Sequence, residues 1–328
     1  MDFIVGSFNH DLYTLRFEPA TSDKSKASLS LIRPTPAIGG HSWLALSRKK
    51  DFLYCTAWTK PQPSIAAYSV QNSGRNIQFL NAKPIQALSG YVCCDAHHIY
   101  SVGGPTGEVF RIAGDGSIGD MVQKLDFGEP PLTLVNKHFA PRPTDGPRHT
   151  WPHPNGKVLY SLQEHTSMVD LFSIDEIGVT LSHMQGVKVI PVDKDPKHYW
   201  ADEVRLSTGP DHEKPRYMYA STRGLKPETK GYVAVFRLKD DGTLESVEAL
   251  HIWETQTSGG IANAIEPAPW QKGREASDAT EYLALTDSEE GWVFMLSFDG
   301  KEVREVARLS LGKTEEGEVV QAATTVWL

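Results

Sequence analysis

Two arginines and a glutamate are the residues of this chain whose types and spacing most favour a binding or catalytic site. Arg148 opens a short apolar segment that ends at Pro152, and Glu164 follows a second segment, Val158–Leu162. Asn155-Gly156 lies between the two segments, and Asn-Gly between apolar runs is a strong β-hairpin signal. The two outer ends of a hairpin lie side by side, so we expect Arg148 to meet Glu164.

Arg223 extends this pattern to a later part of the chain. It lies in Ser221-Thr222-Arg223-Gly224, at the position in its own repeat that Glu164 occupies in the hairpin. Two guanidinium groups next to a carboxylate suit a small anionic substrate, because each guanidinium offers paired and permanently charged donors to a carboxylate. A structural Arg–Glu pair that joins neighbouring sheets is an equally consistent interpretation.

His149 is a fourth candidate, and it follows Arg148 directly. Successive side chains of a strand point to opposite faces, so we expect Arg148 and His149 to diverge. A packing histidine between sheets is the alternative interpretation of His149. His149 and His153 are four residues apart, which on a strand separates them by about 13 Å at ~3.3 Å per residue, so we reject a zinc site there.

Other polar residues stand near the ends of expected strands. Alternation places Glu203 and Arg205 on one face of a strand and Asp202 on the other, and contacts between sheets are the simplest interpretation of these acids. Ser258-Gly259-Gly260 is either a plain turn or a place where backbone amides approach an anion. The remaining candidates are His165, Asn263, Asp287 and His41.

The elements that must position these residues form a weak repeat, and the expected class is all-β. Four short strands recur in units of roughly 40 to 50 residues, which is typical of a β-propeller. Five such units cover approximately residues 41–70, 90–112, 146–182, 201–248 and 261–307.

The two ends of the chain complete the count. The first residues supply three strands between Phe3 and Ile32, and the segment from Gln321 to Leu328 supplies one more. We therefore predict six four-stranded blades in a single domain over residues 1–328, with the N- and C-terminal strands sharing one blade. The Pro-rich segment Gly128–Asp145 has no room for another four strands.

The composition of the chain limits the classes of partner that it is expected to bind. The formal net charge is −8 and no basic block is present, which argues against nucleic acid or an anionic membrane surface. We find no secretory signal and no run of ~18 apolar residues. Three cysteines, two of them adjacent, favour a reduced cytoplasmic protein. No P-loop, dinucleotide fingerprint or Cys-x-x-Cys is present, so no cofactor and no metal are predicted; the oligomeric state stays open.

Several motifs resemble one family. Gly146-Pro147-Arg148-His149 with His153-Pro154-Asn155-Gly156-Lys157 resembles the lactonase-type propellers, which include the bacterial 6-phosphogluconolactonases. Similarity to the fungal carboxy-cis,cis-muconate cyclases within that family is carried by the following segments: Tyr199-Trp200-Ala201-Asp202, Thr257-Ser258-Gly259-Gly260, Pro267-Ala268-Pro269-Trp270 and Thr286-Asp287-Ser288-Glu289-Glu290-Gly291-Trp292.

The resemblance implies a metal-free cycloisomerisation of a cis,cis-muconate to a lactone, in the β-ketoadipate pathway of aromatic degradation. It places Arg148, Glu164 and Arg223 on the family's arginine and glutamate positions. The family's histidine belongs to a blade that precedes the Pro-Arg segment, and the seven blades of the family are six here; His149 is the available substitute. A lactone hydrolase of the 6-phosphogluconolactonase type and a non-catalytic propeller that binds a partner are the alternatives.

Overall fold

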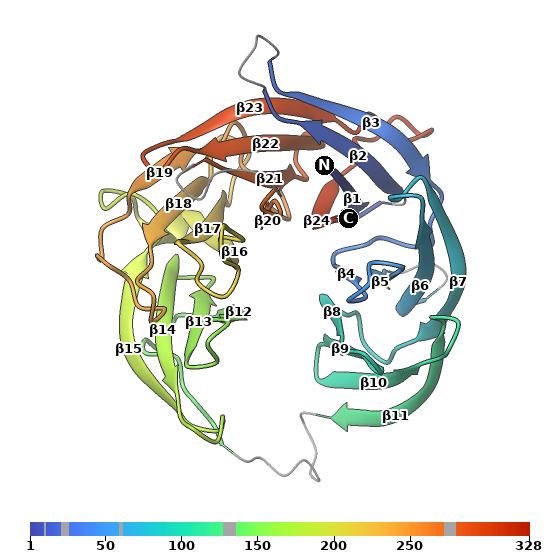
Figure 1. Cartoon of the computed structure of the whole chain (residues 1–328), viewed down its shortest axis with the longest axis horizontal. Coiled ribbons are helices and arrows are strands. Elements are labelled where there is room, and N and C mark those ends of the chain that lie inside the picture. Colours follow the sequence, from blue (N-terminus) through green and yellow to red (C-terminus); the bar gives the residue numbers. More distant parts are fainter. Residues whose placement is uncertain (10, 21–25, 59–61, 127–135, 272–279) are drawn as a thin grey trace. The chain divides into compact units, whose positions relative to one another are not determined.

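The chain is built almost entirely of antiparallel β-strands (Figure 1). The computed structural model describes all residues except 10, 21–25, 59–61, 127–135 and 272–279. Within these described ranges there are 24 strands and one short 3₁₀ helix, η1 (Pro196–His198). The strands belong to two compact units, residues 1–133 with 309–328 and residues 134–308. A single domain over residues 1–328 stays a prediction.

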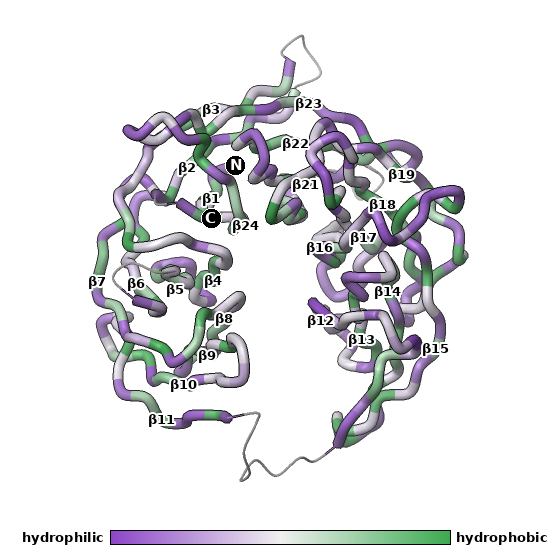
Figure 2. Tube along the Cα trace, turned by 180° about the vertical axis from the view of Figure 1, so that it is seen from behind, coloured by the Kyte–Doolittle hydropathy of each residue, from purple (hydrophilic) through white to green (hydrophobic). Residues whose placement is uncertain are grey.

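The first unit contains three four-stranded sheets, with strand orders β24-β1-β2-β3, β4-β5-β6-β7 and β8-β9-β10-β11. Their strands have the following bounds: β1 (Asp2–Ser7), β2 (Leu12–Glu18), β3 (Ser28–Thr35), β4 (Leu44–Leu46), β5 (Phe52–Ala57), β6 (Ser64–Gln71), β7 (Asn76–Pro84), β8 (Tyr91–Cys94), β9 (His98–Gly103), β10 (Thr106–Ile112), β11 (Ile118–Asp126) and β24 (Ala322–Trp327). Strand β11 carries both hydrophilic and hydrophobic residues along its length (Figure 2).

The second unit contains the other three sheets, with strand orders β12-β13-β14-β15, β16-β17-β18-β19 and β20-β21-β22-β23. Their strands have the following bounds: β12 (Pro147–Pro152), β13 (Val158–Gln163), β14 (Met168–Ile174), β15 (Leu181–Lys188), β16 (Tyr199–Leu206), β17 (Tyr217–Gly224), β18 (Tyr232–Arg237), β19 (His251–Glu254), β20 (Ile265–Pro267), β21 (Glu281–Asp287), β22 (Trp292–Phe298) and β23 (Val303–Ser310).

Sheets within a unit pack face to face, and the middle sheet of each unit is buried on both faces. In β5, Leu53 and Cys55 belong to one apolar cluster and Tyr54 belongs to the next. In β17, Met218 and Tyr219 divide between two clusters in the same way. Successive side chains of a strand point to opposite faces, so a strand covered on both sides is apolar throughout rather than alternating. This explains the continuous apolar runs of the sequence.

Six consecutive four-stranded antiparallel sheets with this packing confirm the predicted class, an all-β propeller fold with four-stranded blades. The shared terminal blade is confirmed as well, because β24 pairs with β1 in the sheet β24-β1-β2-β3. Phe3 pairs with Trp327 across these two strands, and their rings lie 4.6 Å apart.

The segment between β11 and β12 carries no strand in its described part, residues 136–146. The rest of the predicted connection, up to residue 135, lies outside the described residues. Arg142 attaches this segment to the sheet of β12–β15, since its Nε donates to Asp145 at 2.6 Å and its Nη2 donates to the buried Asp170 at 2.5 Å. No helix in the described ranges has both the length and the apolar character needed to cross a membrane.

The predicted hairpin is present as β12 and β13. Its turn contains Asn155 and Gly156, with Gly156 at φ +69°, a region that glycine enters without a steric penalty. The side chain of Asn155 accepts a hydrogen bond from the amide of Lys157 at 2.8 Å. At the other end of the hairpin, Glu164 donates its amide proton to the carbonyl of Gly146 at 2.9 Å, so the two outer ends lie together as expected.

Replacement of Trp327 by Ala tests the shared blade. Trp327 is 6% exposed and packs on Phe3, so Trp327→Ala should lower the free energy of unfolding by about 3–5 kcal/mol, as for other large-to-small core changes. Val247→Ala is the control: Val247 is 65% exposed and its loss should change stability by less than about 0.5 kcal/mol. Urea denaturation measures both, and equal effects would contradict the terminal pairing.

Candidate functional site

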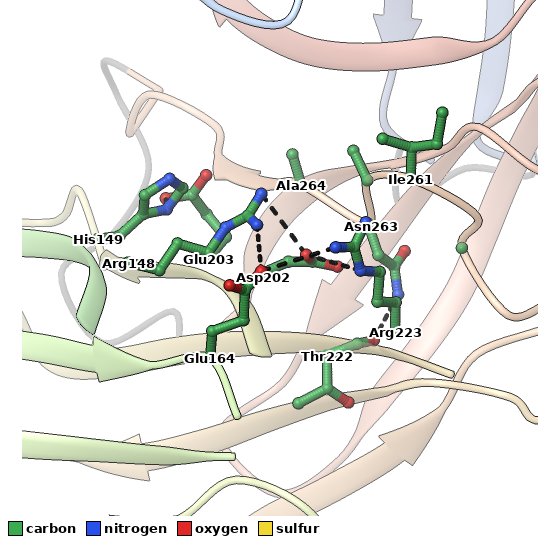
Figure 3. Close-up of polar contacts among 12 residues, drawn as sticks. Arg148, His149, Glu164, Asp202, Glu203, Thr222, Arg223, Ile261, Asn263 and Ala264 are labelled. Atoms are coloured by element: carbon green, nitrogen blue, oxygen red, sulfur yellow. Dashed lines mark hydrogen bonds and ion pairs between the residues drawn. The ribbon is translucent and has the colours of Figure 1, made fainter. Parts of the chain in front are cut away.

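Arg148, Glu164 and Arg223 come together in the second unit, at the ends of strands from two neighbouring sheets (Figure 3). Arg148 lies near the start of β12, Glu164 directly follows β13, and Arg223 lies near the end of β17. Nη1 of Arg148 donates to Oε1 of Glu164, and Nη2 of Arg223 lies 3.6 Å from the same oxygen. The structure therefore places three of the four predicted site residues in one cluster; their role in catalysis stays a prediction.

Asp202 is the central member of this cluster (Figure 3). Its Oδ1 lies 3.4 Å from Nε of Arg223 and 3.7 Å from Nη2 of Arg148. Two guanidinium groups and two carboxylates thus share one site, and their formal charges sum to zero when both acids are ionised. We call these four side chains, Arg148, Glu164, Asp202 and Arg223, the arginine–carboxylate cluster.

Local irregularities of two strands direct the side chains of this cluster. Along β16, Ala201 pairs with Thr222 and Glu203 pairs with Ser221, so Asp202 is the extra residue of a β-bulge. Along β12 the register also shifts between Pro147 and Thr150, the stretch that holds Arg148 and His149. Bulges bend a strand and redirect a side chain, and they are frequent next to active sites.

Exposure differs among the four side chains. Arg148 and Glu164 are 24% and 17% exposed, whereas Arg223 and Asp202 are 9% and 2% exposed. Arg223 is further fixed by its guanidinium group, which lies 5.1 Å from the ring centroid of Trp200, a cation–π contact, and by a 3.3 Å hydrogen bond to the carbonyl of Gly260. A ligand that enters this cluster therefore meets Arg148 and Glu164 at its more accessible side.

Burial raises the pKa of Asp202 above its usual 3.8. The positive charges of Arg223 and Arg148 oppose this effect, and the negative charge of Glu164 adds to it. Neither carboxylate oxygen of Asp202 has a hydrogen-bond donor among the residues that the structure describes. Buried polar atoms normally have hydrogen-bond partners, so this carboxyl group is an exception that requires a functional or electrostatic reason.

His149 contacts a different acid. Its Nδ1 lies 2.8 Å from Oε1 of Glu203, which also pairs with Arg205, and Nε of Arg205 donates to Glu266 at 2.8 Å. Burial alone would raise the pKa of Glu203, but Arg205 and His149 outweigh it and the pKa is lowered. The predicted divergence of Arg148 and His149 is thus observed, and so is the predicted separation of Asp202 from Glu203 and Arg205.

The loop before β20 does not offer free amides to an anion. The amides of Gly259 and Gly260 donate to the hydroxyl groups of Thr257 and Ser258 at 3.2 Å, and the amide of Ile261 donates to Ser288 at 2.6 Å. The group that this loop directs at Arg223 is the carbonyl of Gly260, an acceptor. The turn interpretation of Ser258-Gly259-Gly260 therefore holds, and an amide cradle is absent from this described loop.

The other polar candidates have structural contacts. Asn263 donates to the carbonyl of Thr222 at 2.8 Å, next to Arg223, and so fixes the loop to β17. Asp287 accepts hydrogen bonds from the amides of Glu289 and Glu290. His165 is half exposed at 49%, beside Trp200 and 3.7 Å from Glu164. His41 belongs to the first unit.

The sequence indicated Asp202 only as a contact between sheets and did not indicate Trp200 as part of the site. The period-2 pattern did separate Asp202 from Glu203, but a bulge has no reliable sequence signal, so its direction toward two arginines was not foreseeable. Among the described residues, no group of three His, Cys, Asp or Glu side chains is arranged to hold a metal ion. The absence of a metal or cofactor from the reaction stays a prediction.

The fold and the cluster agree with a family match. A model described as "Lactonase, 7-bladed beta-propeller" matches residues 2–130 and 119–256. The chain therefore belongs to the lactonase family of β-propellers.

Two fungal relatives show which kinds of family member this chain is similar to. Muconate cycloisomerase 1 of Cutaneotrichosporon cutaneum is 34% identical over 383 aligned residues, which cover 100% of this chain and 98% of the relative. Carboxy-cis,cis-muconate cyclase of Neurospora crassa is 34% identical over 199 residues, 58% of this chain and 49% of that protein. A 6-phosphogluconolactonase of Serratia proteamaculans is 30% identical over 269 residues, covering 71% of this chain and 77% of that protein.

Solved structures share the fold. The structure of a putative 6-phosphogluconolactonase from Bacteroides fragilis covers this chain fully with a TM-score of 0.74 at 19% identity. A periplasmic gluconolactonase from Pseudomonas aeruginosa also gives a TM-score of 0.74, at 15% identity.

The number of blades separates this chain from its family. The family is described as seven-bladed, whereas the described residues form six four-stranded sheets. The alignment with the Cutaneotrichosporon relative has 383 positions, 55 more than the 328 residues of this chain. That difference is similar to residues 199–254, the span of one sheet from β16 to β19.

Asp202→Asn tests the burial of this acid through stability. A raised pKa in the folded protein means that the folded state keeps the proton of Asp202 to higher pH than the unfolded chain. Its contribution to stability is then present below the usual pKa of 3.8 and is lost as pH rises through the folded pKa. The free energy of unfolding of the wild type, relative to Asp202→Asn, should fall from pH 4.5 to pH 8 in denaturant titrations. A relative increase would contradict the assignment.

Proposed function

We propose that this protein is a cycloisomerase that converts a cis,cis-muconate, with or without a 3-carboxy group, to its muconolactone in aromatic degradation. The observation that carries the proposal is the arginine–carboxylate cluster, in which Arg148 and Arg223 flank one buried acid and share a second. The names of the two fungal relatives support the reaction type.

The chemistry of this reaction determines which groups the site must contain. One carboxylate oxygen of the substrate attacks a carbon of the conjugated diene, and a C–O bond forms. The π-electron pair moves to the carbon α to the other carboxylate, where it takes up a proton. A dianionic muconate and one proton thus give a monoanionic lactone, so the site must bind two carboxylates, accept transient negative charge and supply a proton.

Arg148 and Arg223 meet the first two demands. In this proposal each guanidinium binds one substrate carboxylate through paired, charge-assisted hydrogen bonds. The carboxylate that receives the migrating electron pair becomes more negative in the transition state, and a fixed guanidinium stabilises that charge without reorganising. Arg223 is already fixed in position, because its guanidinium group stacks on Trp200 and donates a hydrogen bond to the carbonyl of Gly260.

Glu164 and Asp202 are the two acids of the cluster that can carry the proton. Glu164 is the more exposed of the two and accepts a hydrogen bond from Arg148. His149 contacts Glu203 at 2.8 Å, so its part in the proposal is to hold that acid rather than to reach the substrate.

Lactone hydrolysis is the second candidate, favoured by the relatives named 6-phosphogluconolactonase. A phosphorylated lactone requires a surplus of positive charge for its phosphate. The two acids of the cluster leave its two arginines without a surplus of positive charge. Lactone formation from a muconate consumes a proton, so protonation of one of these acids can both offset the charge of the substrate and supply that proton.

Arg148→Ala and Arg223→Ala test the cycloisomerase assignment. Each should lower kcat/KM for 3-carboxy-cis,cis-muconate by about 10²- to 10³-fold, because each removes a fixed donor from developing charge. Loss of the diene absorbance measures turnover, and circular dichroism checks the fold. Arg148→Lys should recover little, since an ammonium group lacks the planar fork.

Arg237→Ala is the matched control, since Arg237 is 38% exposed and pairs with Glu245 outside the cluster. It should retain wild-type kinetics. Unchanged kinetics in both cluster variants would overturn the assignment of the arginines. Wild-type protein that leaves the diene intact but opens 6-phosphogluconolactone would favour the hydrolase instead.

A further inference from the structure

We propose that Asp202 takes up a proton when a carboxylate ligand binds to Arg148 and Arg223, and that this is the proton which lactone formation consumes. The inference rests on the proposed function and deepens it, because it assigns the proton to one side chain. It also predicts a property, proton uptake on ligand binding, that does not depend on turnover.

The charge of the site is the first argument. When both acids are ionised, the two guanidinium groups balance the carboxylates of Glu164 and Asp202. A ligand with two carboxylates adds two negative charges to the same two arginines. Four negative charges against two positive ones are unfavourable in a poorly solvated site, and protonation of one acid is the simplest relief.

The burial of Asp202 selects it over Glu164. Asp202 is 2% exposed, whereas Glu164 is 17% exposed, so burial penalises the charged form of Asp202 more strongly. Glu164 also accepts a direct hydrogen bond from Arg148, while Asp202 has only longer charge contacts of 3.4 and 3.7 Å. Because Asp202 is the more buried acid and has no direct hydrogen bond from an arginine, negative charge added by a ligand favours its neutral form first.

Few groups around Asp202 can offset the negative charge that a ligand adds. Arg148 faces it from β12, Arg223 faces it from β17, and Glu164 faces it from the end of β13, whereas His149 contacts Glu203 and has the smallest electrostatic effect of these groups on Asp202. Burial and Glu164 raise the pKa of Asp202 even before a ligand is present, against the effect of both arginines. His149 is in contact with Glu203, so its positive charge, when present, is shared with a second acid.

Proton uptake by Asp202 provides the one proton that lactone formation consumes. The ligand-bound site holds one proton on an oxygen of Asp202. The C–O bond forms, the π pair moves to the α carbon, and that carbon receives the proton. Asp202 is then ionised again, and the monoanionic lactone leaves a cluster whose charges balance. One proton is taken from solvent for each turnover.

Proton uptake is measured directly with a saturated ligand that cannot react. Adipate carries two carboxylates and no diene. We expect its addition to wild-type protein in weak buffer at pH 7 to remove protons from solution, as reported by a pH indicator or by titration calorimetry in buffers of different ionisation enthalpy. Asp202→Asn should bind adipate at least as tightly at pH 8 and take up no proton.

Glu164→Gln is the matched variant. It should retain an uptake that depends on Asp202, smaller than in the wild type because the negative charge of Glu164 is removed. Uptake that persists in Asp202→Asn and disappears in Glu164→Gln would overturn the inference and assign the proton to Glu164. Binding of adipate by the wild type without any uptake would also overturn it. Thermal unfolding of each variant confirms that it is folded.

Measurements of turnover distinguish a failure of this inference from a failure of the proposed function. If the wild type cyclises a muconate, Asp202→Asn should lose at least about 10²-fold in kcat, the scale of general acid catalysis, with little change in KM. A full kcat in Asp202→Asn would overturn the inference alone. If the wild type shows Asp202-dependent uptake with adipate but cyclises no muconate, the proposed function fails and the proton site stands.

Discussion

The site depends on one electrostatic constraint: two guanidinium groups and two carboxylates must share a small region at the ends of strands β12, β13 and β17 and beside the bulge of β16. Each charge is costly to bury without a partner, and Asp202 at 2% exposure and Arg223 at 9% are the most buried of the four. Removal of one member therefore changes the balance of the other three. This coupling makes the cluster sensitive to an incoming anion.

The propeller supplies the geometry that this balance requires. Sheets that pack face to face bring the first strands of neighbouring blades together, and contacts of β12 and β13 with β16 join two blades at this site. The bulge at Asp202 then directs a carboxyl group between arginines from both blades. A second acid, Glu203, one residue along the chain, pairs instead with His149 and Arg205, so adjacent acids have opposite pKa shifts.

The sequence predicted the fold and part of the cluster for identifiable reasons. Apolar runs separated by turn residues predicted the four-stranded repeat, and Asn155-Gly156 predicted the hairpin that brings Arg148 to Glu164. Asp202 was placed on the correct face, yet its importance depends on a bulge and on burial between two blades, and neither has a local signal. Trp200 was missed because its contact with Arg223 joins paired strands whose register the sequence alone does not give. The segment Gly128–Asp145 was predicted to be too short for four strands, and the described residues form six four-stranded sheets, one fewer than the seven blades of the family description.

Identification of the product in heavy water shows whether the protein cyclises a muconate and where the new hydrogen is placed. Purified protein is mixed with 3-carboxy-cis,cis-muconate in D₂O, and the product is analysed by nuclear magnetic resonance. We expect a lactone that carries one deuterium on the carbon α to a carboxylate, because the proton consumed in ring closure comes from solvent through the site. A diene that remains intact in the presence of folded protein would contradict it.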